Sequence, residues 1–264
     1  MKNRILKEYC ISFVGAGRVA GSMCREIYFT GCKIDSVISK SEANGLQLAN
    51  DCNASWTNKY SIPESTDLVI VSVPDSQLKS VLRKLKYRHG TILAHTAGSS
   101  GLDVFPEEAE HKGVIYPLQT FSKNRKVKFM SLPVFIEASD SRTAEVLSEI
   151  AGSLGSKVYF ADTEHRQKLH LAAVFACNFT NHMLTLGKKL AYDAGYSFEE
   201  LKPLVEETFL KAAEMGPDNS QTGPAVRNDK NTIRKHLELL SYDHDLKRIY
   251  REISGSVFKY YNRK

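Results

Sequence analysis

Two glycines and an alanine near the amino terminus have the spacing G-x-G-x-x-A, which is typical of dinucleotide-binding sites. Gly15 permits a tight turn, Gly17 lets the backbone approach a pyrophosphate, and Ala20 lets the next helix pack closely on a strand. The N–H groups that begin this helix then face the anion. A glycine turn can also be only a turn, so the motif needs a strand before it and a helix after it. The residues that we predict to contact the pyrophosphate are Gly15, Ala16, Gly17, Arg18, Val19 and Ala20.

The end of the second predicted strand, residues 33–38, is where such proteins distinguish NAD from NADP. An acidic residue about 20 residues beyond the glycines would bind the ribose hydroxyls of NAD. This chain has Ser39, Lys40 and Ser41 there, and two hydroxyls with an ammonium group suit a 2′-phosphate. We therefore predict NADP(H) as the cofactor. The alternative is that Ser39 and Ser41 only cap the next helix.

Two loops that follow apolar strands should line the same crevice, because ligands bind at the carboxyl ends of parallel strands. Val73, Pro74 and Asp75 end the strongest strand and should pass beside the cofactor, although Asp75 could equally cap a helix. His95 and Thr96 begin a small polar loop, H-T-A-G-S-S-G, which suits a nicotinamide or a substrate. His95 is a candidate proton donor because histidine titrates near neutral pH, but it could equally be packed at a strand end.

Further polar candidates lie later in the chain. Residues 164–194 repeat apolar side chains at helical spacing, which predicts one long helix buried on more than one face. His170 and Asn178 within it must be hydrogen-bonded if they are buried, and they either tie helices together or reach the crevice. Together with Gln119, which follows a strand, they are candidates to polarise or protonate a substrate. No carboxylate lies at zinc-like spacing with them, so we predict no metal site.

A loop with two Gly-Pro pairs, residues 215–230, holds a candidate for binding a substrate anion. The guanidinium of Arg227 offers a bidentate fork for a carboxylate or a phosphate, and Asp229 lies close to it in sequence. The alternative is that Asp229 or Asp218 pairs with Arg227 and only stabilises the loop.

The secondary-structure elements that must position these residues are strands and helices in the first part of the chain and helices alone in the second. Strand and helix patterns alternate up to Phe160, which predicts an α/β domain with a doubly wound, mostly parallel sheet. From about Asp162 onward the apolar period is helical and no strand pattern remains. We therefore predict a dinucleotide-binding domain over residues 1–162 and an all-α domain over residues 163–264.

The composition is that of a soluble globular protein, with 42% hydrophobic and 25% charged residues. No apolar stretch approaches the roughly 18 residues of a membrane span, and Met1–Cys10 lacks the apolar core of a secretory signal. The five cysteines form no C-x-x-C pair, which favours reduced thiols in the cytoplasm. The net charge of +6 is spread along the chain, without a basic block interleaved with aromatics. We therefore expect a cytoplasmic protein that binds neither membranes nor nucleic acids.

Six segments together resemble one family: V-G-A-G-R-V-A, V-S-V-P-D, H-T-A-G-S, Y-P-L-Q-T-F-S, L-H-L-A-A-V-F-A-C-N and T-G-P-A-V-R-N-D. Over nearly its whole length the chain resembles the Rossmann-like oxidoreductases with a carboxyl-terminal domain of unknown function, DUF2520. These belong with ketopantoate reductase, pyrroline-5-carboxylate reductase and F420-dependent NADP oxidoreductase. The resemblance implies an NADP-binding Rossmann domain and a helical domain of the 6-phosphogluconate-dehydrogenase type, which commonly dimerises.

The chain also departs from these relatives. Those that act on hydroxyacids or ketopantoate use a lysine four residues before an asparagine. Asn178 matches the asparagine, but Val174 stands at the position of the lysine. The usual general acid is therefore absent, which argues against ketopantoate reduction. Asn228 stands where many members have the glycine of Arg-Gly-Asp.

These observations predict a homodimeric, NADP(H)-dependent oxidoreductase that transfers hydride to or from a small, anionic oxo/hydroxy or imino/amino substrate. The absent lysine keeps a second hypothesis open, a non-catalytic NADP(H)-binding sensor or interaction protein. A role for F420 rests on analogy of fold alone. The catalytic candidates are Gln119, Asn178, His95 and His170, and the substrate-binding candidates are Arg227, Asp229 and Thr96.

Overall fold

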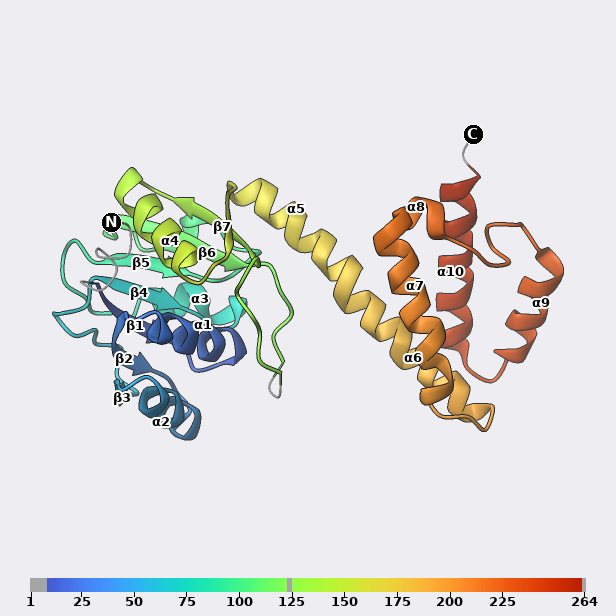
Figure 1. Ribbon diagram of the computed structural model, residues 1–264, viewed down its shortest axis with the longest axis horizontal. Helices are drawn as coiled ribbons and strands as arrows, with labels where there is room; N and C mark the ends of the chain where they lie inside the picture. Colours follow the sequence, from blue (N-terminus) through green and yellow to red (C-terminus); the bar gives the residue numbers. More distant parts are fainter. Residues whose placement is uncertain (1–8, 123–124, 263–264) are drawn as a thin grey trace. The chain divides into compact units, whose positions relative to one another are not determined.

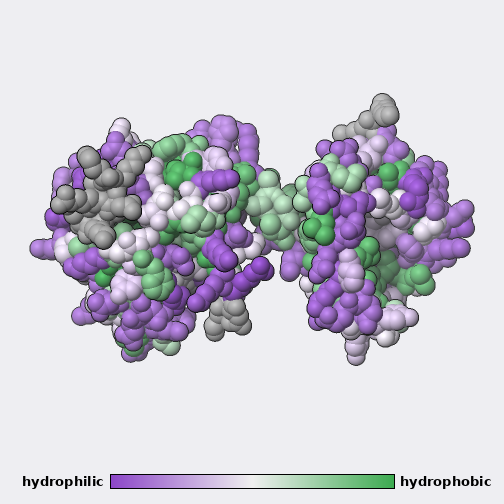
Figure 2. Space-filling view, in the orientation of Figure 1, coloured by the Kyte–Doolittle hydropathy of each residue, from purple (hydrophilic) through white to green (hydrophobic). Residues whose placement is uncertain are grey.

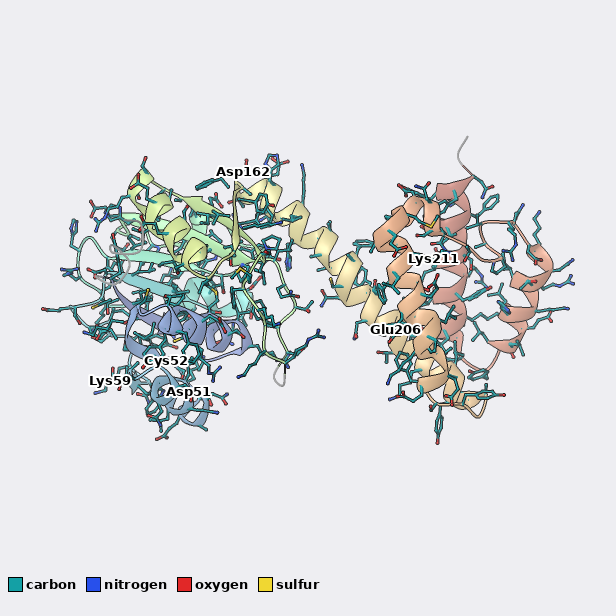
Figure 3. All side chains as sticks on the ribbon, viewed as in Figure 1. Asp51, Cys52, Lys59, Asp162, Glu206 and Lys211 are labelled. Atoms are coloured by element: carbon teal, nitrogen blue, oxygen red, sulfur yellow. The ribbon has the colours of Figure 1, made fainter. Side chains whose placement is uncertain are left out.

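The computed structural model describes residues 9–122 and 125–262, so most of the segment Met1–Cys10, where we expect no secretory signal, lies outside the described residues. The chain divides into two compact units, Met1–Cys177 and Asn178–Lys264. Figure 1 shows that the first is built on a sheet and the second on helices. Asp162, the last residue of the predicted dinucleotide-binding domain, caps the first helix that follows the sheet (Figure 3).

The first unit contains an eight-stranded sheet with the order β3-β2-β1-β4-β5-β6-β7-β8. Neighbouring strands are parallel except β6 and β7, which are antiparallel. This confirms the predicted doubly wound, mostly parallel sheet. The strands are β1 (Cys10–Val14), β2 (Lys33–Ile38), β3 (Ser55–Thr57), β4 (Leu68–Val71), β5 (Ile92–His95), β6 (His111–Pro117), β7 (Pro133–Ala138) and β8 (Lys157–Phe160).

Two hydrophobic clusters, one on each face, explain why the central strands are apolar throughout. Phe13 and Ile70 belong to a cluster with residues of helices α1, α2 and α4, whereas Val14 and Val71 belong to a cluster with residues of α3. The helices of this unit are α1 (Arg18–Phe29), α2 (Glu42–Asp51), α3 (Asp75–Leu82), α4 (Ser141–Ser153), α5 (Thr163–Ala173) and a 3₁₀ turn, Leu102–Val104.

The long helix predicted over residues 164–194 is interrupted. Helix α5 runs into a π-helical segment, Val174–Phe179, which is followed by α6 (Thr180–Asp193). The expectation that this helix is buried on more than one face is wrong, because Arg166 is the one buried residue of α5 and α6 has none. Regular apolar spacing shows where a helix can form but does not show whether the chain itself covers that helix.

The second unit is helical, and no strand occurs in its described residues. Aspartates at N-caps start two of its helices, Asp229 for α9 and Asp243 for α10. No helix among the described residues has the length and apolar character to cross a membrane. Besides α6, the unit comprises a 3₁₀ turn (Glu199–Leu201), α7 (Lys202–Met215), α8 (Pro217–Ser220), α9 (Lys230–Leu239) and α10 (His244–Tyr261).

Candidate dinucleotide-binding site

The glycine turn between β1 and α1 has an open helix N-terminus. Gly15 has φ of +112°, and a Cβ there would collide with the carbonyl of Ser72 in the neighbouring β4–α3 loop. At Gly17, in contrast, a Cβ would meet nothing within 4 Å. No side chain caps α1 and its first turn holds no acidic residue, so its N–H groups and partial positive charge are available to an anion. Ala20 is fully buried, as close packing of the helix requires.

The predicted 2′-phosphate loop is partly engaged within the protein. The Oγ of Ser39 donates to the carbonyl of Ser41 (2.8 Å) and accepts from Nε1 of Trp56 (3.1 Å). Ser41 is the N-cap of α2, since its Oγ accepts from the N–H of Asn44 (3.4 Å). Lys40 is exposed, and its Nζ donates to Gln77 in α3 (3.2 Å). Of the three residues, Lys40 is therefore the one whose exposed, positively charged group is available to a phosphate.

The β4–α3 loop is connected to the loop that follows β5. Asp75 is the first residue of α3 and not its N-cap, which is Pro74. The Oδ2 of Asp75 accepts a short hydrogen bond from Oγ of Ser99. Thr96 donates from Oγ1 to Oγ of Ser72 (3.0 Å). The carboxyl ends of β4 and β5 are thereby held together, at the edge where ligands bind in doubly wound sheets.

His95 is packed as a structural residue. It is 0% exposed, and its ring stacks on Phe105 with centroids 5.3 Å apart. Its Nδ1 accepts from the N–H of Ala97 (3.2 Å), so its Nε2 carries the hydrogen that the carbonyl of Gly101 accepts (3.3 Å). Burial lowers the pKa of His95 to about 4. A neutral imidazole with both nitrogens occupied favours the alternative of a histidine packed at a strand end over a proton donor.

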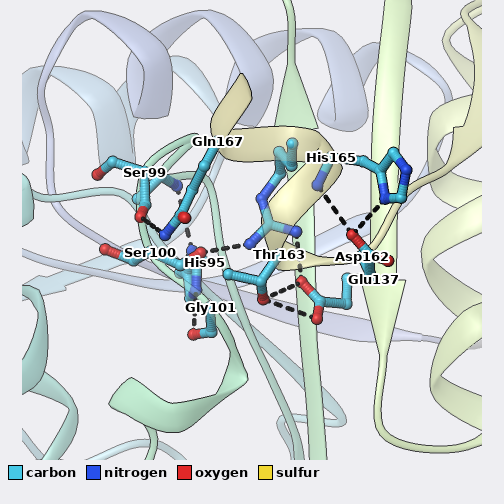
Figure 4. A network of polar contacts seen from close by, with 11 residues as sticks. His95, Ser99, Ser100, Gly101, Glu137, Asp162, Thr163, His165 and Gln167 are labelled. Atoms are coloured by element: carbon cyan, nitrogen blue, oxygen red, sulfur yellow. Dashed lines mark hydrogen bonds and ion pairs between the residues drawn. The ribbon is translucent and has the colours of Figure 1, made fainter. Parts of the chain in front are cut away.

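Three consecutive carbonyls of the same loop accept hydrogen bonds (Figure 4). Gln167 donates to Ser99 (2.7 Å), Arg166 to Ser100, and His95 to Gly101. Helix α5 thus supplies two of the three donors, and β5 supplies the third.

Arg166 connects this loop to β7. Its side chain is 0% exposed and forms an ion pair with Glu137, whose two carboxylate oxygens also accept from Oγ1 of Thr163 at 2.9 Å each. No local sequence pattern predicted these contacts, because the paired residues lie 26 to 66 positions apart in the sequence. A basic residue in an amphipathic helix is ordinarily a solvated one.

Tyr116 and His170 form a pair at the same edge of the sheet. The hydroxyl of Tyr116, the residue before the last of β6, lies 3.0 Å from Nδ1 of His170 in α5. Their rings meet edge to face, with centroids 5.9 Å apart and an interplanar angle of 74°. His170 is thus connected to the carboxyl end of β6 through Tyr116, which was not among the predicted site residues.

Of the remaining predicted residues, one belongs to the first unit and three to the second. Gln119 is exposed, and its Oε1 accepts from the N–H of Thr120 (2.8 Å). Asn178 and Arg227 are exposed residues of the second unit. Asp229 caps α9 by accepting from the N–H and the hydroxyl of Thr232, and these bonds, with the charge of Arg227, lower the pKa of the Asp229 carboxyl. No cluster of three or more potential metal ligands occurs in the part of the chain that the structure describes.

A doubly wound sheet, an uncapped first helix and loops gathered at the carboxyl ends of β1, β4 and β5 define a Rossmann-type protein with a helical carboxyl-terminal unit. The family comparisons are more specific. A Rossmann-like domain model matches residues 5–119, and the model of the domain of unknown function DUF2520 matches residues 132–257. The chain belongs to the family of Rossmann-like proteins with a carboxyl-terminal DUF2520 domain, as the resemblance implied.

Solved structures show the same architecture. A putative NADP oxidoreductase from Bacteroides fragilis is 39% identical, with a TM-score of 0.88, and the match covers 96% of this chain and 99% of that one. A protein from Thermotoga maritima is 22% identical, with a TM-score of 0.70 and coverage of 95% and 98%. An imine reductase from a Pseudomonas species is 15% identical, with a TM-score of 0.60 and coverage of 96% and 92%. None of the curated proteins matches this chain.

Proposed function

We propose that the chain is an oxidoreductase that uses NADP(H) and acts on a small, anionic oxo/hydroxy or imino/amino substrate. The observation that carries the proposal is the open, uncapped start of α1 at Gly17, where a diphosphate can reach backbone N–H groups. The name of the Bacteroides fragilis protein, which is 39% identical, supports it. The cofactor, when bound, supplies or accepts the hydride, and the protein supplies orientation and the proton.

Lys40 is the residue that favours NADP(H) over NAD(H) in this proposal. It is exposed at the end of β2, and the loop around it carries no carboxylate before Glu42, the first residue of α2. An ammonium group there would pair with a 2′-phosphate. Ser41 would contribute less, because its hydroxyl already caps α2.

His170 is the proton donor of the proposed reaction, in preference to His95. The imidazole of His170 is partly exposed, whereas His95 is buried and both its nitrogens are hydrogen-bonded. We assign polarisation of the substrate to Gln119 and Asn178, and binding of its anionic group to Arg227, with Thr96 and Asp229 holding the adjoining loops. Arg227 suits this role because its guanidinium is exposed and forms no ion pair within the described chain.

The helical unit supports a homodimer. Among its described residues, Leu240 and Leu246 are the buried hydrophobic ones, and Figure 2 shows hydrophobic side chains on its surface. An apolar surface of this extent on a small unit is typical of an interface. Sedimentation velocity should show a dimer, and a monomer at micromolar concentration would contradict this part of the proposal. The unit's large exposed apolar residues include Leu204, Phe209, Leu210, Met215, Leu239, Ile253 and Phe258.

We also propose that the protein resides in the cytoplasm. All five cysteines are free thiols. Cys24 and Cys52 form a hydrogen bond between thiols, with sulfur atoms 3.5 Å apart, and no disulfide, which agrees with a reducing compartment.

Calorimetric titration with NADPH and NADH tests the cofactor, and a panel of 2-oxo acids and cyclic imino acids tests the reaction through oxidation of NADPH. We expect NADPH to bind at least tenfold more tightly than NADH, and at least one panel member to be reduced. Absence of NADPH binding would refute the proposal. Tight binding without turnover on any substrate would favour the non-catalytic alternative.

A matched pair of variants tests the site itself. Gly17→Ala and Gly152→Ala each add one methyl group where nothing lies within 4 Å, but only Gly17 faces the proposed pyrophosphate. We expect Gly17→Ala to weaken NADPH binding about tenfold or more, which corresponds to about 1.4 kcal/mol, while Gly152→Ala binds like the unaltered protein. Equal affinities for the two variants would place the cofactor elsewhere.

A further inference from the structure

The pair of Tyr116 and His170 has the arrangement of a proton-transferring histidine and the residue that orients it. Tyr116 is 9% exposed, and its hydroxyl lies 3.0 Å from Nδ1 of His170. The other ring nitrogen, Nε2, forms no hydrogen bond within the described part of the chain. In a histidine that exchanges protons, a partner at one nitrogen orients the ring and leaves the other nitrogen to react.

The loop after β5 lies directly against this pair. A Cβ on Gly98 would come within 2.8 Å of Cζ of Tyr116 and 2.9 Å of Nδ1 of His170. That loop also binds Asp75 through Ser99 and the β4 end through Thr96. The pair is therefore part of the same edge of the sheet as the proposed cofactor site, and the glycine is what allows this close approach.

The surroundings keep the phenol neutral. Burial, followed by the negative charge of Asp75, raises the pKa of Tyr116, while Arg166 opposes the shift. The charged and titratable groups that act on the phenol are Asp75 from α3, Arg166 from α5 and Cys177 from the π-helical segment. The oxygen of a neutral hydroxyl can accept from the Nδ1–H of an imidazolium and from the Nδ1–H of a neutral imidazole alike. Tyr116 can therefore hold Nδ1 in both protonation states of His170.

We propose that Tyr116 is the positioning residue of the proposed reaction, and that it holds Nδ1 of His170 so that Nε2 exchanges the proton with the substrate. This inference rests on the proposed function. In the reducing direction the Nε2–H bond of the imidazolium breaks and an O–H or N–H bond forms at the substrate's oxo or imino group. The electron pair of the broken bond stays on Nε2, which leaves a neutral imidazole. Nδ1–H donates to the oxygen of Tyr116 before and after this step.

A second pair of the same kind in the helical unit provides a control. Nδ1 of His236 lies 2.7 Å from the hydroxyl of Tyr250, and the rings meet edge to face with centroids 5.5 Å apart. Tyr116→Phe and Tyr250→Phe therefore remove the same interaction at two places, and only the first lies in the unit that holds the proposed cofactor site.

The first measurement is nitrogen-15 NMR of the histidine rings in the full-length protein, with and without NADP⁺. In the unaltered protein we expect one dominant tautomer of neutral His170, and a change in its signals on saturation with NADP⁺ but none in those of His236. Tyr116→Phe should yield a mixture of tautomers for His170 only. A mixture already present in the unaltered protein, or signals of His170 that NADP⁺ leaves unchanged, would overturn the proposal. Failure of the proposed function differs from both, because NADP⁺ would then not bind, or the cofactor would bind without turnover of any substrate in the panel.

The second measurement is the rate of NADPH oxidation with the most active member of the substrate panel. We expect His170→Gln to lower kcat about 100-fold or more, which is the range of general acid catalysis. Tyr116→Phe should lower kcat about tenfold and alter its pH profile, with KM for NADPH unchanged, as loss of orientation without loss of binding requires. Tyr250→Phe should leave kcat unchanged. An unaltered pH profile and kcat in Tyr116→Phe would refute a positioning role.

Discussion

Replacing Glu137 by alanine should destabilise the first unit more than replacing its ion-pair partner, Arg166, by methionine. Both substitutions break the same contact, but they leave different groups behind. Glu137→Ala leaves a guanidinium that is 0% exposed, with the carbonyl of Ser100 as its remaining partner and its Nε unbonded among the described residues. Arg166→Met leaves a carboxylate that is 16% exposed and still accepts from Thr163 at 2.9 Å.

The expected losses of unfolding free energy follow from the groups that each substitution leaves behind. Removal of one partner from a buried ion pair costs about 3–5 kcal/mol because it leaves a buried charge uncompensated, and this applies to Glu137→Ala. For Arg166→Met we expect about 1–3 kcal/mol, since the carboxylate keeps water and a hydroxyl while methionine fills much of the vacated volume. The double variant should cost less than the sum of the two single variants, because each removes the same contact.

Urea unfolding followed by tryptophan fluorescence measures this difference in the correct unit. The chain has one tryptophan, Trp56, which lies in β3 of the first unit. Free energies of unfolding then follow by linear extrapolation. Arg25→Met is a matched control, because Arg25 pairs with Asp51 at 2.8 Å with side chains 39% and 38% exposed. It should cost at most about 1 kcal/mol.

A cost of Glu137→Ala equal to or below that of Arg166→Met would refute the reasoning, since burial of the guanidinium would then carry no penalty. Costs of both variants within the range of the Arg25→Met control would refute it as well.

Three further predictions concern the loops around the site. Gly45→Ala should lower the free energy of unfolding by about 1–3 kcal/mol and weaken NADPH binding, because a Cβ there would collide with Ser39 and Trp56; unchanged urea midpoints would contradict it. Lys40→Ser should weaken NADPH binding about tenfold and leave NADH binding unchanged in calorimetry, whereas an equal loss for both would exclude contact with the 2′-phosphate. Stability should fall as the pH is lowered from about 6.5 towards 4, because unfolded His95 takes up a proton near its ordinary pKa while burial keeps the folded residue neutral down to about 4. This loss amounts to at most about 3 kcal/mol. His95→Gln should reduce the slope of the urea midpoint against pH in this range. A slope equal to that of the unaltered protein would contradict the assignment of the effect to His95.

The sequence was sufficient to predict the sheet because local patterns determine it. The run from Leu68 to Val71 is apolar at every position, as a strand covered on both faces requires, and it is fully buried. The change to helices after residue 162 was equally visible. The π-helical segment Val174–Phe179 was not, because one wider turn barely alters apolar spacing.

The site was less predictable because its residues meet through the fold. The glycine motif lies within a few residues of sequence, and its geometry at Gly15 and Gly17 follows from those residues. The contact between Tyr116 and His170 spans 54 residues, and that between Gln167 and Ser99 spans 68. Side-chain pairs at such separations depend on strand order and helix direction, and no local pattern encodes them.

The reversal of the sheet at β7 explains why the connecting helix belongs to the site. β7 runs against β6, and β8 runs with β7, so the chain leaves β8 heading away from the edge where β5 and β6 finish. Helix α5 must lead the chain back. Along the way Thr163 contacts Glu137, Arg166 contacts Ser100, and His170 contacts Tyr116. The number of residues between Phe160 and His170 is thus set by the span of the sheet. Inserting or deleting a single residue between Phe160 and Thr163 would turn the helix by about 100° and move all three side chains away from their partners together.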